Sequence, residues 1–169
     1  GERRPVGGER FLTTVLFTDI VGSTELAASL GDAEWHARLD DHDRLDREQI
    51  RRFGGREIKA TGDGFVACFD GPAHAIDCGH EIVRSLQQSG LDVRIGLHTG
   101  ECERRGDDIA GLAVHVAARV GALAGRGEVL VSRTVTDLVA GSGVMFDDRG
   151  ERKLKGLDEP WRLFAATAR

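Results

Sequence analysis

The chain alternates between short apolar runs and longer stretches in which apolar residues recur at helical spacing. Residues 11–18 are almost all apolar or β-branched, which is typical of a strand buried on both faces. A helix start is expected at residues 25–28, directly after Ser23 and Thr24. Over residues 32–53 the apolar positions are sparse and lie in a dense field of charges, which predicts a long amphipathic helix with one buried stripe.

Two strands are expected on either side of a tight turn, 61-TGDG-64, because its Asp-Gly pair is a strong hairpin signal. The strands cover residues 57–60 and 65–69. Pro72 then opens a helix whose apolar face continues to Ser89.

The second half of the chain predicts shorter elements. Residues 93–99 alternate apolar and polar positions as a strand does, and a polar loop is expected over 101–108. Apolar residues at helical spacing predict a helix over 113–123. The remaining expected elements are strands at 129–131, 145–146, 152–154 and 162–165, and a helix at 134–139.

The order of these elements predicts an α+β fold. Strands and helices alternate as β-α-α-β-β-α-β-α-β, and the alternation includes a hairpin but no internal repeat. We therefore expect a ferredoxin-like sheet with helices packed on one face.

Composition is consistent with a single domain. The 169 residues are 40% apolar and 30% charged, as in ordinary globular proteins. Residues 1–10 are polar and glycine-rich and are expected to be a disordered tail or the end of a linker, so the ordered domain would cover 11–167. The net charge of -5 argues against a surface that coats nucleic acid, and no nucleic-acid partner is expected.

The cysteines and the hydropathy pattern bear on the compartment. Cys68, Cys78 and Cys102 lack the spacing of metal ligands, and buried free thiols in a reducing compartment are the simplest interpretation. No apolar run approaches the length of about 18 residues that a spanning helix needs. The sequence therefore predicts no membrane segment and a cytoplasmic protein, or the cytoplasmic domain of a longer one.

Two aspartates are candidates for a metal site. Asp19 ends the first expected strand and Asp63 lies in the tight turn, so neighbouring strands could bring both carboxylates to one edge of the sheet. Close carboxylates repel each other unless a cation lies between them, and Mg²⁺ or Mn²⁺ prefers such hard oxygen ligands. Taken singly, Asp19 could be a helix cap and Asp63 a turn residue, and both interpretations remain open.

Three other features could bind a phosphorylated ligand. The turn 20–24 could aim backbone N–H groups at an anion, although it lacks the ending of a Walker loop. Lys59 and Asp108 could together read a purine edge, or could be an ordinary strand lysine and loop acid. His115 and Arg119 share a helical face, and an arginine among apolar neighbours needs an anionic partner.

Four segments together resemble a known family. The stretches FTDIVGST, IKATGDGFVACF, VRIGLHTGE and DDIAGLAVHVAARV occur in this order between residues 17 and 120. Their residues and spacing are similar to the catalytic domain of class III nucleotidyl cyclases, and most similar to the adenylyl cyclase homology domains of actinobacteria. The resemblance covers about residues 11–167.

The resemblance implies a head-to-tail homodimer with two active sites at its interface. Two divalent metal ions, Mg²⁺ or Mn²⁺, would be held by Asp19 and Asp63 with help from the carbonyl of Ile20. The same chain would bind the triphosphate of ATP through Arg94 and the turn that consists of Ile20, Val21, Gly22, Ser23 and Thr24. The partner chain would supply Lys59 and Asp108 to adenine, Lys155 to the triphosphate, and the helix that carries His115 and Arg119.

The reaction implied is the formation of cyclic AMP and pyrophosphate from ATP. Most members of the family have an asparagine, thought to orient the ribose, where this chain has His115. Histidine keeps a hydrogen-bond donor but changes its reach. Two alternatives to an adenylyl cyclase remain: a guanylyl or dual-specificity cyclase, and a cyclase fold retained as a nucleotide-sensing or dimerisation module.

Overall fold

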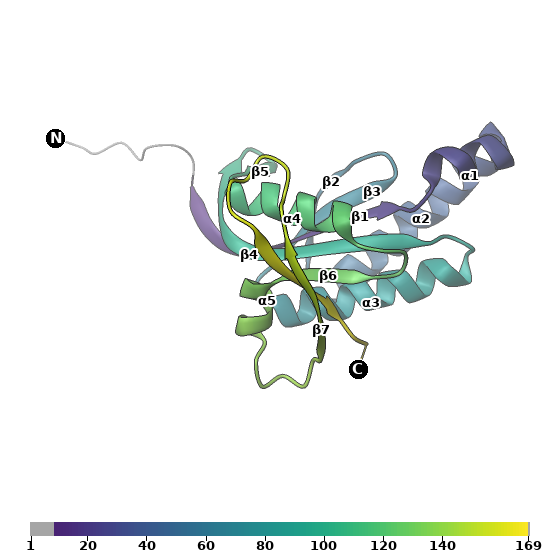
Figure 1. Ribbon diagram of the computed structural model, residues 1–169. Helices are drawn as coiled ribbons and strands as arrows, with labels where there is room; N and C mark the ends of the chain where they lie inside the picture. The colour runs from purple at the N-terminus through teal and green to yellow at the C-terminus, as the bar shows by residue number, and fades with distance from the viewer. Residues whose placement is uncertain (1–8, 169) are drawn as a thin grey trace.

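The computed structural model describes residues 9–168, which form one mixed sheet with helices on both of its faces (Figure 1). The strand order is β2-β3-β1-β4-β6-β8-β7, and β5 pairs with β4 outside this path. The strands are β1 Arg10–Ile20, β2 Arg56–Ala60, β3 Gly64–Phe69, β4 Val93–Arg105, β5 Asp108–Ala110, β6 Val129–Ser132, β7 Phe146–Arg152 and β8 Trp161–Ala166. The helices are α1 Ser23–Leu30, α2 Asp32–Arg52, α3 Pro72–Gln88, α4 Leu112–Leu123 and α5 Arg133–Leu138.

The α+β class expected from the sequence is confirmed. The central strand β1 pairs antiparallel with both β3 and β4, while β4 pairs parallel with β6. The hairpin expected around the Asp-Gly turn is β2 and β3, which pair antiparallel. Every residue of β3 is buried, because helices cover this part of the sheet on both sides.

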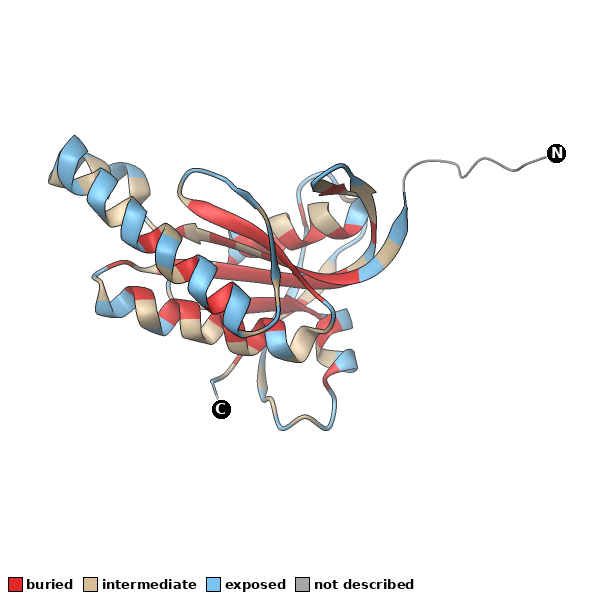
Figure 2. Ribbon diagram, turned by 180° about the vertical axis from the view of Figure 1, so that it is seen from behind, coloured by how far each residue is buried: buried red, intermediate tan, exposed pale blue. Residues whose placement is uncertain are grey.

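The expectation that the helices pack on one face is wrong. Helices α2 and α3 cover one face, where Leu16 and Ile95 pack with residues of α3 such as Ile76 (Figure 2). Helix α4 covers the opposite face, where Ala117 packs with Val15 and Val66. Successive strand side chains point to opposite faces, so the apolar residues at both parities of β1 and β3 require cover on both sides.

Several expected boundaries are also corrected. Strand β1 begins at Arg10, inside the tail expected at 1–10, of which residues 1–8 lie outside the described part. Strand β4 continues to Arg105 through the expected polar loop, because β1 runs beside it in register as far as Glu103. The strands expected at 145–146 and 152–154 are one strand, β7, that occupies the residues between them.

The three cysteines are buried and free, as the sequence predicts. None of the helices in residues 9–168 combines the length and the apolar character that crossing a membrane requires.

Two glycines set how closely α4 approaches the sheet. A Cβ added to Gly96 in β4 would lie 2.2 Å from the backbone nitrogen of Gly121 in α4 and 2.8 Å from the carbonyl oxygen of Ala117. Distances this short do not occur between real atoms, so the helix lies on β4 backbone against backbone. The position of α4 over β4 therefore depends on the absence of a side chain at Gly96.

A carboxyl group is buried on the face of the sheet that α2 and α3 cover. Asp46 in α2 is fully buried, and its oxygens have no hydrogen-bond partner among the described residues. Nε2 of His42 lies 3.1 Å from Oδ2 of Asp46, which would be an ion pair only with a protonated imidazole. Burial raises the pKa of the Asp46 carboxyl well above its ordinary value of 3.8, and the nearby charge of Asp43 adds to the rise while Arg47 opposes it.

Gly96→Ala is expected to lower the free energy of unfolding by about 1–3 kcal/mol, because the added methyl group must displace backbone rather than a flexible side chain. Urea unfolding followed by circular dichroism measures the change. Gly125→Ala is the matched control, since a Cβ there meets nothing closer than 3.9 Å. Equal losses in the two variants would contradict the backbone contact.

Stability should depend on pH through Asp46. Its pKa is raised in the folded state, so its favourable contribution is complete below the ordinary value of 3.8 and is lost as the pH rises through the folded-state pKa. Asp46→Asn, which cannot ionise, should therefore gain stability relative to the natural chain as the pH is raised. Urea unfolding over a pH series tests this, with the exposed Asp40→Asn on the same helix as control. A stability difference that stays constant with pH would contradict it.

Candidate active site

The two candidate metal ligands lie side by side at one end of the central strands. Asp19 is in β1, where its backbone faces Gly64 of β3 on one side and Arg94 of β4 on the other. The N–H of Ile20 donates to the backbone carbonyl of Asp63 at 3.0 Å, which holds the tight turn against the end of β1. The structure thus brings together the two carboxylates that the sequence singled out.

This approach requires a glycine after Asp63. A Cβ on Gly64 would fall 1.8 Å from the carbonyl oxygen of Thr18. The Asp-Gly pair therefore does more than form a hairpin, since it also allows the turn to approach β1 closely.

Cationic and hydroxyl groups already bind both carboxylates. Arg94 donates to Asp19 from Nε at 2.8 Å and from Nη2 at 3.3 Å, and its Nη1 donates to the carbonyl of Ala122 at 3.1 Å. The hydroxyl of Ser23 donates to Oδ2 of Asp63 at 3.0 Å. The hydrogen bond to Asp19 is the main reason that the pKa of Arg94 is raised, and the charge of Asp63 adds to it. One guanidinium therefore lies within the field of both carboxylates.

The oxygens at this end of the sheet fit a hard divalent cation. Within residues 9–168, no group of three or more His, Cys, Asp and Glu side chains could hold a metal by itself. The donors are two carboxylates and neighbouring backbone carbonyls, the oxygen ligands that Mg²⁺ and Mn²⁺ prefer. A site with so few protein ligands suits ions that also bind water and substrate phosphates.

The turn after Asp19 has fewer free donors than the sequence suggested. The N–H of Ile20 is bound to Asp63, and the N–H of Val21 donates to the carbonyl of Asp92 at 2.8 Å. Two of the five N–H groups in the expected anion cradle are therefore used to fix the turn itself.

The other three N–H groups belong to the start of α1. Gly22 has a φ of 67°, in the left-handed region that favours glycine, and α1 begins at Ser23 without a side-chain cap. The first bond of the helix runs from the N–H of Leu26 to the carbonyl of Gly22. The N–H groups of Gly22, Ser23 and Thr24 precede that bond, in the position where helices bind anions.

Lys59 and Asp108 form a pair although 49 residues separate them in sequence. Nζ of Lys59 in β2 lies 3.0 Å from Oδ2 of Asp108 at the start of β5, and both side chains are 49% exposed. The N–H of Ile109, followed by Lys59, lowers the pKa of the Asp108 carboxyl. A donor and an acceptor thus lie together on an accessible surface, as reading a purine edge requires.

The remaining candidates lie on or beside α4. Nε of Arg119 is buried without a hydrogen-bond partner among the described residues. Nε2 of His115 is 3.0 Å from the backbone carbonyl of Lys155, whose own side chain is exposed.

The single chain does not bring all candidates together. Helix α4 links them, because Arg94 reaches Ala122 near its end and His115 lies two turns earlier, about 10 Å along the axis. Within residues 9–168, no hydrogen bond or ion pair joins Asp19 or Asp63 to any of the five candidates implied for a partner chain. These five are Lys59, Asp108, His115, Arg119 and Lys155.

The sequence analysis missed two contributors, Asp92 and Ala122. Each acts here through its backbone carbonyl, which accepts from Val21 or from Arg94. A backbone carbonyl is present at every residue, so residue type carries no signal for this role.

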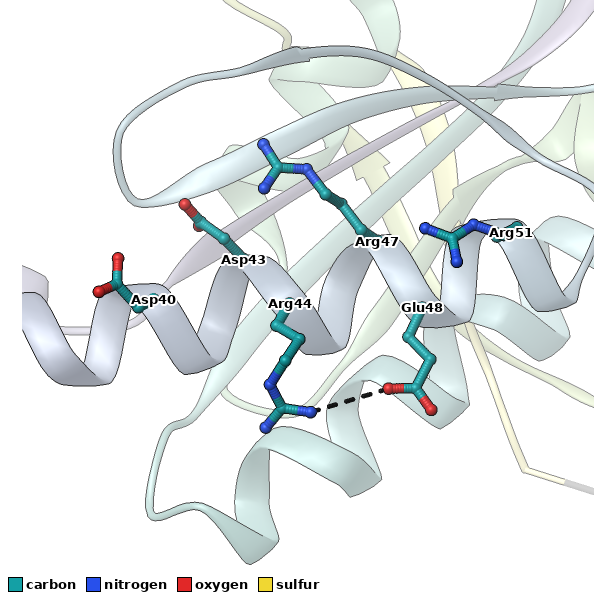
Figure 3. A pocket seen from close by; sticks show the side chains of 6 residues that line it. All are labelled: Asp40, Asp43, Arg44, Arg47, Glu48 and Arg51. Atoms are coloured by element: carbon teal, nitrogen blue, oxygen red, sulfur yellow. Dashed lines mark ion pairs between the residues drawn. The ribbon is translucent and has the colours of Figure 1, made fainter.

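A charged depression on α2 is not part of this constellation. It measures about 600 Å³ and is lined by Asp40, Asp43, Arg44, Arg47, Glu48 and Arg51, none of which is a candidate above (Figure 3). Arg44 and Glu48 form an exposed pair four residues apart, as is common on a solvated helix face. This surface is therefore an ordinary charged helix face.

Comparisons with known proteins identify the family of the chain. The family model described as adenylate and guanylate cyclase catalytic domain matches residues 11–165. An uncharacterized protein of Mycobacterium tuberculosis, Rv0891c, is 32% identical over 152 residues, which are 87% of this chain and 53% of that protein. An adenylate cyclase of Podospora anserina is 28% identical over 218 residues, or 91% of this chain and 10% of that protein. The chain thus spans about half the length of the first relative and a tenth of the length of the second.

Solved structures share the fold over nearly the whole chain. The adenylyl cyclase CyaB from P. aeruginosa superposes with a TM-score of 0.88 at 24% identity, covering 95% of this chain and 96% of that one. An adenylate/guanylate cyclase/hydrolase from Silicibacter pomeroyi gives 0.85 at 30% identity, with 95% and 99% covered. The guanylate cyclase domain of RhGC from Catenaria anguillulae, solved with GTP, gives 0.86 at 19% identity, with 96% and 100% covered. Proteins named for either nucleotide therefore share this architecture.

Proposed function

The chain belongs to the class III adenylate and guanylate cyclase catalytic domain family, and from this premise we propose that it converts ATP to 3',5'-cyclic AMP and pyrophosphate. The observation that carries the proposal is the meeting of Asp19 and Asp63 at the start of the turn that leads into α1. The two carboxylates suit divalent metal ions, and the helix N–H groups beside them suit the phosphates of a nucleotide.

Asp19 and Asp63 would hold two divalent ions, Mg²⁺ or Mn²⁺, with the carbonyl of Ile20 as a further ligand. Metal bound here would lower the pKa of the ribose 3'-hydroxyl and neutralise phosphate charge. The guanidinium of Arg94 donates to the carboxylate of Asp19. A metal ion bound by Asp19 would therefore release Arg94 to bind a phosphate.

The phosphates would be bound by groups at the start of α1, on β4, on α4 and in the turn at Lys155. The N–H groups of Gly22, Ser23 and Thr24 would bind the triphosphate, with Arg94 on the same chain and Lys155 from the partner. Arg119 would neutralise the charge that develops on the α-phosphoryl oxygens. Its buried Nε without a partner supports this role, since a guanidinium so placed needs an anion.

Lys59 and Asp108 would select adenine. Adenine offers a ring acceptor beside an amino donor, which an ammonium and a carboxylate match. The 3.0 Å contact between them supports a joint role. Guanine-selective members of the family usually carry a glutamate and a small or cysteine-type residue at these positions, which favours ATP over GTP.

We further propose that a second copy of the chain completes each site. The support is that, within residues 9–168, no hydrogen bond or ion pair joins Asp19 or Asp63 to the five candidates on and around α4 and at the Lys59–Asp108 pair. A head-to-tail pair would place Lys59, Asp108 and α4 of one copy against Asp19 of the other. The free, buried cysteines support a cytoplasmic setting for this assembly.

Asp19→Asn and Asp63→Asn should each lower cyclic AMP formation in the presence of Mn²⁺ by at least about 100-fold, because each removes a metal-binding charge. Chromatographic assays of cyclic AMP formed from ATP and of cyclic GMP formed from GTP, run side by side, measure both activity and base preference. Asp40→Asn on the exposed face of α2 is the control. Full activity in either site variant would contradict the metal assignment, and faster turnover of GTP would favour the guanylyl alternative.

Shared sites predict recovery of activity on mixing. Asp63→Ala and Arg119→Ala should each be inactive alone, yet a heterodimer of the two has one site with both groups intact. An equimolar mixture should regain about a quarter of the natural activity if subunits pair at random and chemistry limits the rate. Analytical ultracentrifugation of tagged chains verifies pairing, and proven heterodimers without recovery would contradict sharing between subunits.

A further inference from the structure

The imidazole of His115 forms a hydrogen bond with a backbone carbonyl. Its Nε2 lies 3.0 Å from the carbonyl oxygen of Lys155, 40 residues away in sequence. A carbonyl can only accept a hydrogen bond, so Nε2 must carry the proton and Nδ1 of the neutral ring must be bare. The contact therefore selects one tautomer.

The ring also packs against the turn that follows Lys155. Gly156 has a φ of 86°, and a Cβ there would lie 3.1 Å from Nε2 and 3.5 Å from Cε1 of His115. The N–H of Leu157 donates to the carbonyl of Leu154 at 3.0 Å, which closes this turn. Glycine at 156 thus lets the turn lie directly under the imidazole.

Apolar packing also anchors this turn to α4. Leu154 is 1% exposed and packs in a cluster with Val116 and Val120 of that helix, and Leu157 packs against the same cluster. Lys155 directly follows Leu154, and its carbonyl is bound to His115 while its side chain is exposed. The segment that carries the lysine is therefore held to the helix that carries Arg119 both by apolar packing and by the hydrogen bond from His115.

We propose that His115 is a positioning residue that clamps the segment 154–157 to α4 and so sets the place of the Lys155 ammonium relative to Arg119. The inference rests on the proposed function, because only there do both cations face one triphosphate. It differs from direct orientation of the ribose, since here His115 acts through Lys155.

A double-mutant cycle tests whether His115 acts through Lys155. His115→Ala should lower kcat/KM for ATP about tenfold, mainly by raising KM, and Lys155→Ala should lower it at least as much. The double variant should be no worse than Lys155→Ala alone. Multiplying effects, or a loss confined to kcat, would overturn the clamp and indicate a separate action of His115. His36→Ala, on the exposed part of α2, is the control for loss of an imidazole.

A second pair of variants loosens the clamp from the other side. Gly156→Ala should reproduce the rise in KM, because its methyl group meets the His115 ring. Gly150→Ala is its matched control, since Gly150 has a similar φ of 80° but nothing within 4 Å of an added Cβ. Equal effects of the two would overturn the role of the ring contact.

An NMR measurement keeps the clamp separable from the cyclase proposal. Nitrogen shifts of neutral His115 should show a protonated Nε2, and His115→Ala should speed hydrogen exchange at the N–H of Leu157. Both results in a chain without cyclase activity would support the clamp while the proposed function failed. A protonated Nδ1, or unchanged exchange at Leu157, would overturn the clamp whatever the activity.

Discussion

The contact between the backbones of β4 and α4 is the constraint on which the candidate site depends. Gly96 and Gly121 allow the helix to lie on the strand without intervening side chains. That closeness lets the guanidinium of Arg94 reach both Asp19 in β1 and the carbonyl of Ala122 at the end of α4. The helix that carries His115 and Arg119 is thereby registered against the strand that carries the first carboxylate.

The charges at the site are paired in a way that suits exchange of partners. Arg94 neutralises Asp19, Ser23 satisfies Asp63, and Lys59 neutralises Asp108. Each of these contacts involves partly exposed side chains, where ion pairs stabilise the fold only slightly. In the proposed function, metal ions, phosphates and a base would replace them at low cost, whereas a deeply buried pair would resist replacement.

Local signals in the sequence were reliable where one short segment decides the structure. The Asp-Gly pair predicted the hairpin of β2 and β3, and the apolar run predicted β1. The predictions that failed concerned relations between segments. The length of β4 depends on its pairing with β1, and the cover of both sheet faces depends on where α4 packs.

The sequence by itself determined the α+β class and the chemical types at the site, because strand and helix periods, glycine turns and carboxylates are local properties of the chain. Only the tertiary structure decided that Asp63 lies beside Asp19, that Lys59 meets Asp108, and that His115 binds the carbonyl of Lys155. It also showed that two N–H groups of the expected cradle are used by the backbone carbonyls of Asp63 and Asp92. Backbone carbonyls occur at every residue and contacts between distant segments depend on packing, so neither leaves a mark that residue type or spacing can reveal.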